Sequence, residues 1–523
     1  MRKKIAVVGA GISGLLACKY AVSKGFVPTV FEAKCSAGGL WNCTLQTTRL
    51  QTPKVVYQFS DFPWPDSVLD EYPTQNDVIH YIQSYAATFD LIKHIQFNSK
   101  VLRIDLQGPS IHDIQSSDQW GGNGGPFYLS RKWILSVQNT QSQTIETFEA
   151  DFVILCVGRF SGLPNIPDFS FGLGPEAFRG QSIHSMELAG MENERAREFL
   201  KGKRVTVVGL QKSALDIAME CSSANGVDFP CTVLYRRAHW HLSEYKVFGI
   251  SLGLLYLNRL SEFFVHKPNE GLILSLLATL LSPLRWGISK LVESDIKRKH
   301  KLSKFGMVPN HSFNEQIGSC LISMLPENFY ERVEQGSINL RKASSFSFYE
   351  YGIVVHNQDG RELSRFETDI VIFATGFLGD DKIEQIFGKE SIRNLIRGPR
   401  DSALPLYREC VNPRVPQLAV IGFSESLSNL YTSELRCRWL AELLEGNIKL
   451  PSIREMEEDI KKWNEYKKNS SGGYFGRSCI GALHTWYNDQ LCIDMGWNPR
   501  RKKMVIEDLL VPYGPTDYVS PLP

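Results

Sequence analysis

The residues best suited to chemistry in this chain form a glycine-rich turn near its start. Gly9, Gly11 and Gly14 follow an apolar run at 5–8 and precede a helix-like stretch. Glu32 stands 18 residues after Gly14, at the end of a second apolar run. The first glycine permits a tight bend, the second lets a pyrophosphate approach the backbone, and the third lets helix and strand pack closely. The helix N-terminus would hold phosphate, and Glu32 would accept hydrogen bonds from ribose hydroxyls. The pattern predicts a dinucleotide site.

A second, imperfect glycine turn lies at 209–214. Gly209 follows a strand-like run, but Gln211 and Ala214 stand where the other two glycines are expected. The next strand-like run ends in Arg236-Arg237 instead of an acid. Because arginine near this position accommodates a 2′-phosphate, we expect the second nucleotide to be NADP. Two solvated surface arginines are the alternative.

Two further segments of the chain repeat one pattern. Asp151 and Asp369 each begin an apolar strand-like run that ends in a glycine, Gly158 or Gly376. In each, the glycine after the strand would let the backbone approach a nucleotide. Two intertwined nucleotide-binding domains would each need this arrangement. We therefore predict an α/β fold with two Rossmann-like dinucleotide-binding domains, divided as 1–170, 171–335 and 336–523, in which the middle part is inserted into the first domain.

The remaining elements are expected to surround these domains. Residues 100–155 read as a β-meander with strands at 101–106, 132–138 and 152–157, and the chain from 451 reads as a helical cap. An amphipathic helix is expected after Thr74, its N-cap. Gly39-Leu40-Trp41 predicts a loop pressed against a flat ligand, and an ordinary turn with a packed Trp is the alternative.

The composition excludes several classes of protein. The 523 residues are 43% hydrophobic and 22% charged with a net charge of +2, which fits a globular enzyme and gives no sign of a nucleic-acid partner. The 11 cysteines are an odd number and none are spaced as Cys-x-x-Cys. We therefore expect mostly reduced core cysteines, no disulfide scaffold, no metal site and no disulfide reductase.

Membrane contact is possible from the sequence but not favoured. Residues 271–284 are uncharged, but the run is too short to span a bilayer and is interrupted by Pro283. A buried helix pair is therefore expected. The alternative is a surface-associating helix near the basic run 297–299. Arg2-Lys3-Lys4 before an apolar stretch resembles a signal peptide, but cleavage would destroy the first turn. A cytoplasmic protein is expected, and the cytosolic face of the endoplasmic reticulum is the alternative.

Together these motifs resemble the flavin-containing monooxygenases, across essentially the whole chain. The family sequence F-x-G-x-x-x-H-x-x-x-aromatic is matched by Phe178, Gly180 and His184, with Leu188 at the last position as a departure. The family linker F-A-T-G-Y/F is matched at 373–377, which includes Ala374, Thr375 and Gly376. The resemblance implies no catalytic side chain, and His184 is interpreted as structural support.

The resemblance also implies the two cofactors and their ligands. FAD is assigned to the first turn, with Gly9, Gly11, Gly14, Glu32, Gly39, Leu40, Trp41 and Thr52. NADPH is assigned to the second turn, with Gly209, Gln211, Ser213, Ala214, Arg236 and Arg237. Many animal-type members carry an Asn beside the flavin, where this chain offers Gln51 or Thr52.

The function implied by the family is oxygenation of a small molecule. NADPH reduces FAD, O₂ adds to give a C4a-hydroperoxyflavin, and one oxygen passes to a soft nucleophile. Segments 212–214, 306–313 and 428–435 resemble the plant branch, which includes the pipecolate N-monooxygenases of plant defence. N-hydroxylation of a small amine or amino-acid-like substrate is therefore expected. The alternatives are a decarboxylating monooxygenase of a 2-oxo acid such as indole-3-pyruvate, or a non-catalytic flavoprotein.

Overall fold

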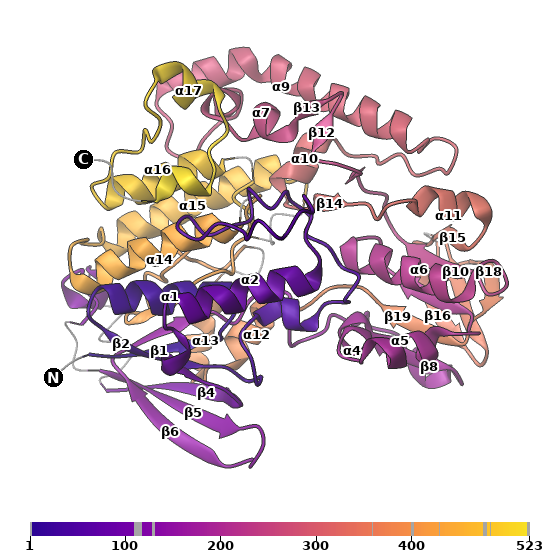
Figure 1. Cartoon of the computed structure of the whole chain (residues 1–523), viewed down its shortest axis with the longest axis horizontal. Coiled ribbons are helices and arrows are strands. Elements are labelled where there is room, and N and C mark those ends of the chain that lie inside the picture. Colours follow the sequence, from indigo (N-terminus) through magenta and orange to yellow (C-terminus); the bar gives the residue numbers. More distant parts are fainter. Residues whose placement is uncertain are drawn as a thin grey trace.

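Two parallel five-stranded sheets organise the chain (Figure 1). The structure is a computed structural model that describes residues 3–108, 118–127, 131–357, 359–398, 402–427, 429–473, 478–481 and 483–519. Arg2 and Ser428, which entered the sequence argument, lie outside the described residues.

The two sheets share one arrangement, as the repeated sequence pattern predicts. The first has the order β20-β7-β1-β2-β3, and the second has the order β15-β10-β9-β19-β8. In each, the strand before the glycine turn lies between the following strand and the strand that begins with the repeated acid. The first sheet contains β1 (Lys4–Val8), β2 (Val27–Phe31), β3 (Ile95–Gln96), β7 (Phe152–Leu155) and β20 (Leu418–Val420). The second contains β8 (Gln181–His184), β9 (Val205–Val208), β10 (Cys231–Tyr235), β15 (Ile338–Lys342) and β19 (Ile370–Phe373).

The repeated acids play the same structural part in both sheets. The Asp151 carboxylate accepts a hydrogen bond from the backbone N–H of Lys4 at 2.7 Å, and the Asp369 carboxylate accepts one from Arg204 at 2.8 Å. Each acid therefore ties the start of its own strand to the start of the strand that leads into the glycine turn.

Helices cover one face of the first sheet and an antiparallel meander covers the other. Helix α1 (Ile12–Ser23) packs with α14 (Asn429–Glu445) in one hydrophobic cluster, and the meander of β4 (Ser99–Gln107), β5 (Lys132–Asn139) and β6 (Ile145–Ala150) closes a second cluster. The predicted third meander strand was wrong. Residues 152–155 form β7 of the parallel sheet, where all four are buried, and the mostly exposed, polar β6 takes its place.

The second sheet is covered in the same way. Helix α6 (Lys212–Asn225) packs on one face, and the meander of β16 (Ser345–Tyr349), β17 (Gly352–His356) and β18 (Glu362–Glu367) packs on the other. Because β15 and β19 lie in this sheet, the second sheet extends beyond residue 335, where the sequence placed a domain boundary.

An insertion after β10 contains the long apolar helix α9 (Leu272–Lys299). The expected buried helix pair was wrong, because one 28-residue helix runs through Pro283 along the edge of the molecule (Figure 1). Leu272 and Ile273 are 91% and 83% exposed. Within the described part of the chain, α9 alone could cross a membrane by length and composition, and 17% of its most apolar stretch is buried. The insertion also holds β11 (His241–Leu242), β12 (Lys246–Val247), β13 (Ile250–Ser251), α7 (Leu252–Tyr256), α8 (Arg259–Glu262), α10 (Phe313–Gly318) and β14 (Ser323–Met324).

The C-terminal part forms the expected helical cap. Helices α15 (Ile453–Ser470), α16 (His484–Asp494) and α17 (Val505–Leu510) follow α14, and α16 and α17 contact α8 of the insertion. The predicted helix after Thr74 is α2 (Gln75–Thr88), and Thr74 caps it in a capping box with Asp77. The other α-helices among the described residues are α4 (Ser185–Ala189), α5 (Asn193–Leu200), α11 (Phe329–Gln335), α12 (Gly379–Gln385) and α13 (Glu390–Arg397).

The cysteines depart from the sequence expectation at one place. Cys320 and Cys479 form a disulfide across 159 residues, although neither sequence position signals a pair. Of the nine free cysteines, seven are buried, as expected for core residues.

Candidate functional site

The first glycine turn leaves no room for side chains. A Cβ atom on Gly9 would lie 2.6 Å from the Cys156 carbonyl oxygen, and one on Gly14 would lie 1.8 Å from the Gly9 carbonyl oxygen. Gly9 has a φ of 103°, which favours glycine. Helix α1 begins at N-cap Gly11 without a side-chain cap, so its first N–H groups are available to an anion.

The Glu32 carboxylate and the 38–41 loop border this turn. Glu32 is buried, and its carboxylate accepts hydrogen bonds from the backbone N–H groups of Ala10 at 2.7 Å and Lys34 at 2.9 Å. Gly39 packs backbone to backbone on Gly11, where an added Cβ would lie 2.8 Å from the Gly11 Cα. The loop continues as a short 3₁₀ helix, Gly39–Cys43. The acid, the turn and the loop are therefore brought together.

Leu40, Trp41 and Thr52 lie further along the same loop region. The Trp41 indole N–H donates to the Tyr57 hydroxyl at 3.0 Å, so this Trp is fixed within the protein, and Leu40 is exposed. Thr52 is half-buried. Its neighbour Gln51 accepts a hydrogen bond from the Met324 N–H at 3.2 Å, which joins this loop to β14 of the insertion.

The second glycine turn repeats the geometry of the first with its own residues. Gly209 has a φ of 134°, and a Cβ there would lie 2.5 Å from the Ala374 carbonyl oxygen. Gln211 is the N-cap of α6 with an extended backbone and no side-chain cap. Ala214 is completely buried in the first turn of the helix, whereas Ser213 is exposed. The substitutions leave the strand–turn–helix geometry intact.

The predicted phosphate-binding arginines are accessible. Arg236 and Arg237 directly follow β10, and both are exposed. Lys342 ends the neighbouring strand β15 and pairs in register with Tyr235, so a third cation lies at this sheet edge. Sequence reasoning missed Lys342 because strand neighbours in a parallel sheet are far apart in the chain.

The two units also meet through a buried ion pair that the sequence analysis missed. Lys212 Nζ lies 2.5 Å from one Asp216 carboxylate oxygen, and the Thr48 hydroxyl donates to the other at 3.0 Å. Burial raises the pKa of Asp216, and the Lys212 cation and the Thr48 hydrogen bond lower it. The spacing of Lys212 and Asp216 on one helix face was visible in the sequence, but Thr48 comes from the first unit and could not be found that way.

Histidine rings gather in the insertion beside this pair. The rings of His239 and His241 lie 6.2 Å apart, and those of His239 and His311 lie 5.6 Å apart. His241 Nδ1 is 2.7 Å from the Ser323 hydroxyl, and burial lowers the pKa of His241 to about 3. His241 is therefore neutral at physiological pH, and no cluster of metal-ligating side chains occurs among the described residues.

The linker motif at 373–377 connects the two chain segments that cross between the sheets, one after β7 and one after β19. The buried His184 ring accepts the Met186 N–H at Nδ1 and donates from Nε2 to the Gly376 carbonyl at 3.0 Å. Burial lowers the pKa of His184, which keeps the ring neutral. The Thr375 hydroxyl donates to the Asn165 carbonyl of the other crossing. Both ring nitrogens of His184 are thus engaged in support.

The remaining family-motif residues also pack structurally. Phe178 is buried against Phe348, and a Cβ on Gly180 would lie 2.4 Å from the Asp369 carbonyl oxygen. Leu188, the departure from the motif, is buried in the core of the second unit. A surface hollow of about 520 Å³ beside Phe178 and Gly180 lies at the amino end of β8 and β19, away from both glycine turns.

The fold and these two turns define the class of protein: an α/β oxidoreductase with two dinucleotide-binding units in one chain. The family described as FMO-like, flavin-binding monooxygenase-like, matches residues 2–516. The chain belongs to this family. It is an FAD- and NADPH-dependent monooxygenase, an enzyme that uses O₂ and a small-molecule substrate.

The comparisons with individual proteins agree with this assignment. The chain is 39% identical to probable flavin-containing monooxygenase 1 of Arabidopsis thaliana, over 98% of this chain and 96% of that protein. It is 27% identical to dimethylaniline monooxygenase [N-oxide-forming] 2 of Oryctolagus cuniculus, over 97% and 85%. The solved structure of an oxidised steroid monooxygenase bound to NADP shares the fold, with a TM-score of 0.63, 18% identity and coverage of 95% and 98%.

Proposed function

We propose that the first turn holds FAD and the second holds NADPH. The observation that carries this proposal is the repeated sheet order, with an uncapped helix N-terminus at each turn. FAD would contact Gly9, Gly11, Gly14, Glu32, Gly39, Leu40, Trp41 and Thr52. NADPH would contact Gly209, Gln211, Ser213, Ala214, Arg236 and Arg237, and we add Lys342. We assign residues 1–170 and 376–523 to the FAD unit and 171–375 to the NADPH unit.

We propose N-hydroxylation of a small amine or amino-acid-like substrate as the reaction. Bound at the first turn, FAD would supply hydride acceptance from NADPH and activation of O₂, and the protein would supply binding, orientation and exclusion of water. The N-oxide-forming relative supports oxygenation at nitrogen. In this chain, Thr48 and the Lys212–Asp216 pair would hold the two units in register at their contact, and His184 would support the linker.

Stopped-flow absorbance of the purified holoenzyme tests the proposal. NADPH should bleach the flavin without O₂, and candidate amines and 2-oxo acids should then be compared for products after O₂ is added. An N-hydroxylated amine supports the proposal. Release of CO₂ from a 2-oxo acid would instead assign the decarboxylating reaction. A protein that neither retains nor accepts FAD would refute the cofactor assignment.

We also propose that the enzyme is cytoplasmic and contacts a membrane surface through α9. Leu272, Ile273, Leu276 and Leu280 are exposed along the first half of the helix, and Val505 and Ile506 are exposed on α17 at the same end of the molecule (Figure 1). Co-sedimentation with phosphatidylcholine vesicles should fall when Leu276 and Leu280 are changed to Ser. Equal recovery of both proteins in the supernatant would refute this contact.

A further inference from the structure

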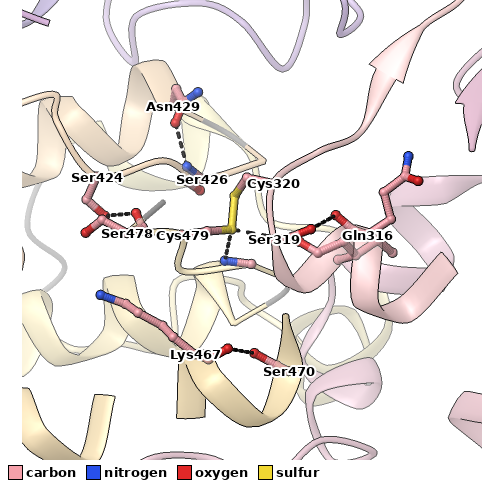
Figure 2. Close-up of a disulfide and its surroundings, with 12 residues drawn as sticks. Gln316, Ser319, Cys320, Ser424, Ser426, Asn429, Lys467, Ser470, Ser478 and Cys479 are labelled. Carbon is pink, nitrogen blue, oxygen red and sulfur yellow. Dashed lines mark hydrogen bonds between the residues drawn. A yellow bond between two sulfur atoms is a disulfide. The ribbon is translucent and has the colours of Figure 1, made fainter. Parts of the chain in front are cut away.

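The Cys320–Cys479 disulfide joins the insertion of the second unit to the C-terminal cap. Cys320 follows α10, and Cys479 lies between α15 and α16 (Figure 2). The sheets are otherwise linked by two backbone crossings and by non-covalent contacts. The disulfide therefore adds a covalent tie between parts that the chain connects only through long paths.

Hydrogen bonds connect Cys479 to the first unit. The backbone N–H of Glu425 donates to the Ser478 carbonyl at 2.9 Å, and the backbone N–H of Ile480 donates to the Glu425 carbonyl at 2.9 Å. Residue 425 lies five residues after the end of β20. Between them, Gly422 lies against the side chain of Ser13 in α1. The segment that carries Cys479 is thus tied to the sheet and helix of the first glycine turn.

Different contacts connect Cys320 to the second unit. Gln316 in α10 is buried, and its side chain bonds both the N–H and the carbonyl of Trp240, five residues after β10. Cys320 also lies three residues before β14, which pairs with β11 and receives the contact from Gln51. The segment that carries Cys320 is therefore tied to the strand that leads to Arg236.

The surroundings of the two sulfur atoms suit reversible exchange. Cys320 is partly exposed and Cys479 is 3% exposed, so Cys320 is the more accessible of the two residues to an external thiolate. The Gly481 N–H donates to Cys479 Sγ at 3.1 Å, and a hydrogen bond of this kind stabilises a leaving thiolate. The Ile317 carbonyl oxygen lies 3.8 Å from the same sulfur, where a reduced thiol would find an acceptor.

We propose that Cys320 and Cys479 form a reversible thiol–disulfide site that sets how far the two nucleotide-binding units can separate. Hydrogen peroxide oxidises the pair: two thiols and one H₂O₂ give the disulfide and two waters. Glutathione reduces it: one glutathione thiolate attacks Cys320 Sγ and Cys479 leaves as a thiolate that takes up a proton. A second glutathione then releases Cys320 as a thiol and leaves as oxidised glutathione.

The consequence for activity rests on the function proposed above. On that function, NADPH held at the second turn must reach the flavin at the first across the contact between the two units, and the disulfide holds those units together beside the Gln51–Met324 contact. The oxidised enzyme therefore admits NADPH more slowly than the reduced enzyme. We expect the second-order rate constant of anaerobic flavin reduction to be at least fivefold lower in the oxidised form.

Two measurements test the site without using activity. Differential alkylation with mass spectrometry should show both cysteines protected after peroxide and fully recovered after glutathione. Hydrogen exchange at 321–325 and 478–481 should be faster in the reduced protein and equally fast in the Cys320→Ser/Cys479→Ser variant. Thiols that never pair, or that peroxide oxidises irreversibly, would overturn the proposal, as would equal exchange in both redox states.

Stopped-flow flavin reduction then tests the consequence. The double variant should match the reduced wild type in the presence and absence of peroxide, whereas Cys35→Ser, which removes an exposed free thiol, should keep the redox response. Should the double variant fold poorly, glutathione-reduced wild type supplies the same comparison. Rates that agree within twofold in both redox states would overturn the gating. No flavin reduction in either state would refute the proposed function, while alkylation and exchange still decide the site.

Discussion

The Gly14→Ala substitution should abolish FAD retention, and the structure sets the size of the effect. The new Cβ would lie 1.8 Å from the Gly9 carbonyl oxygen, whereas such contacts require at least 3.0 Å. The difference, 3.0 − 1.8, means that α1 must move by about 1.2 Å relative to the turn. The obstacle is backbone, so no side-chain rotation can relieve it.

The surrounding core resists this movement. Leu15, Leu16 and Cys18 of α1 are completely buried. Overpacking of this kind typically costs about 1–3 kcal/mol, and we expect the upper end because three buried side chains must shift with the helix. A misplacement of about 1 Å can cost an enzyme about 100-fold in rate, and we expect the Kd for FAD to rise by a similar factor.

The second turn supplies the matched control. Ala214 already carries a Cβ at the equivalent position, so Ala214→Gly should cost about 1 kcal/mol through helix propensity and leave FAD bound. The ratio of flavin to protein absorbance after gel filtration, together with the melting temperature, measures both effects. A Gly14→Ala protein with full FAD and the melting temperature of Ala214→Gly would refute the steric reasoning.

Three further predictions concern the second cofactor, pH and the disulfide. Arg236→Ala should raise the KM for NADPH by about 10–100-fold, because it removes a charged hydrogen bond worth about 1.5–3 kcal/mol. The KM for NADH should stay unchanged. An equal rise of KM for both nucleotides would contradict a role of Arg236 in binding the 2′-phosphate. Burial raises the pKa of the Glu262 carboxyl group to about 8 in the folded protein. Above about pH 4.5 this group therefore keeps its proton in the folded state and loses it in the unfolded state. The free energy of unfolding consequently falls as the pH rises from about 4.5 to 8. Glu262→Gln should reduce this loss of unfolding free energy by up to about 5 kcal/mol. The urea midpoint, measured at pH 4.5 and at pH 8, should therefore change less in the variant than in the wild type. An equal change in both proteins would contradict this prediction. Reduction of the Cys320–Cys479 bond, which closes a loop across 159 residues, should lower the free energy of unfolding by at most about 5 kcal/mol on the chain-entropy estimate, and an unchanged thermal midpoint after reduction would contradict a stabilising tie.

The local pattern of the chain predicted the fold because the relevant constraints act over short distances. Gly14 is required by its contact with Gly9, Gly9 by its local φ of 103°, and Thr74 caps a helix that begins at the next position. The repeated runs after Asp151 and Asp369 predicted strands that do occupy equivalent places in two sheets. These features depend on steric rules that a sequence shows directly.

Other features depended on neighbours that the sequence does not place. The apolar composition of α9 fits a buried helix and an exposed one equally, and only the packing of the insertion decides between them. Strand β6 was missed because its exposed side carries polar residues, whereas β7 is apolar on both sides. Thr48 reaches Asp216 across the two units, and Cys320 reaches Cys479 across 159 residues, so neither contact has a local signal.

Gln211 is the departure whose meaning the structure changes most. In the first turn, a Cβ on Gly11 would lie 3.3 Å from the Gly39 Cα, a tight contact that favours glycine beside the loop at 38–41. In the second turn, Gln211 is the N-cap residue of α6 and has an ordinary extended backbone. The amide Nε2 of Gln211 is buried without a hydrogen-bond partner among the described residues, although burial of such a donor is costly unless it is satisfied. On the proposed NADPH site, a phosphate oxygen or the amide carbonyl of a bound nicotinamide would supply the missing acceptor, so we expect Gln211 to favour the second nucleotide.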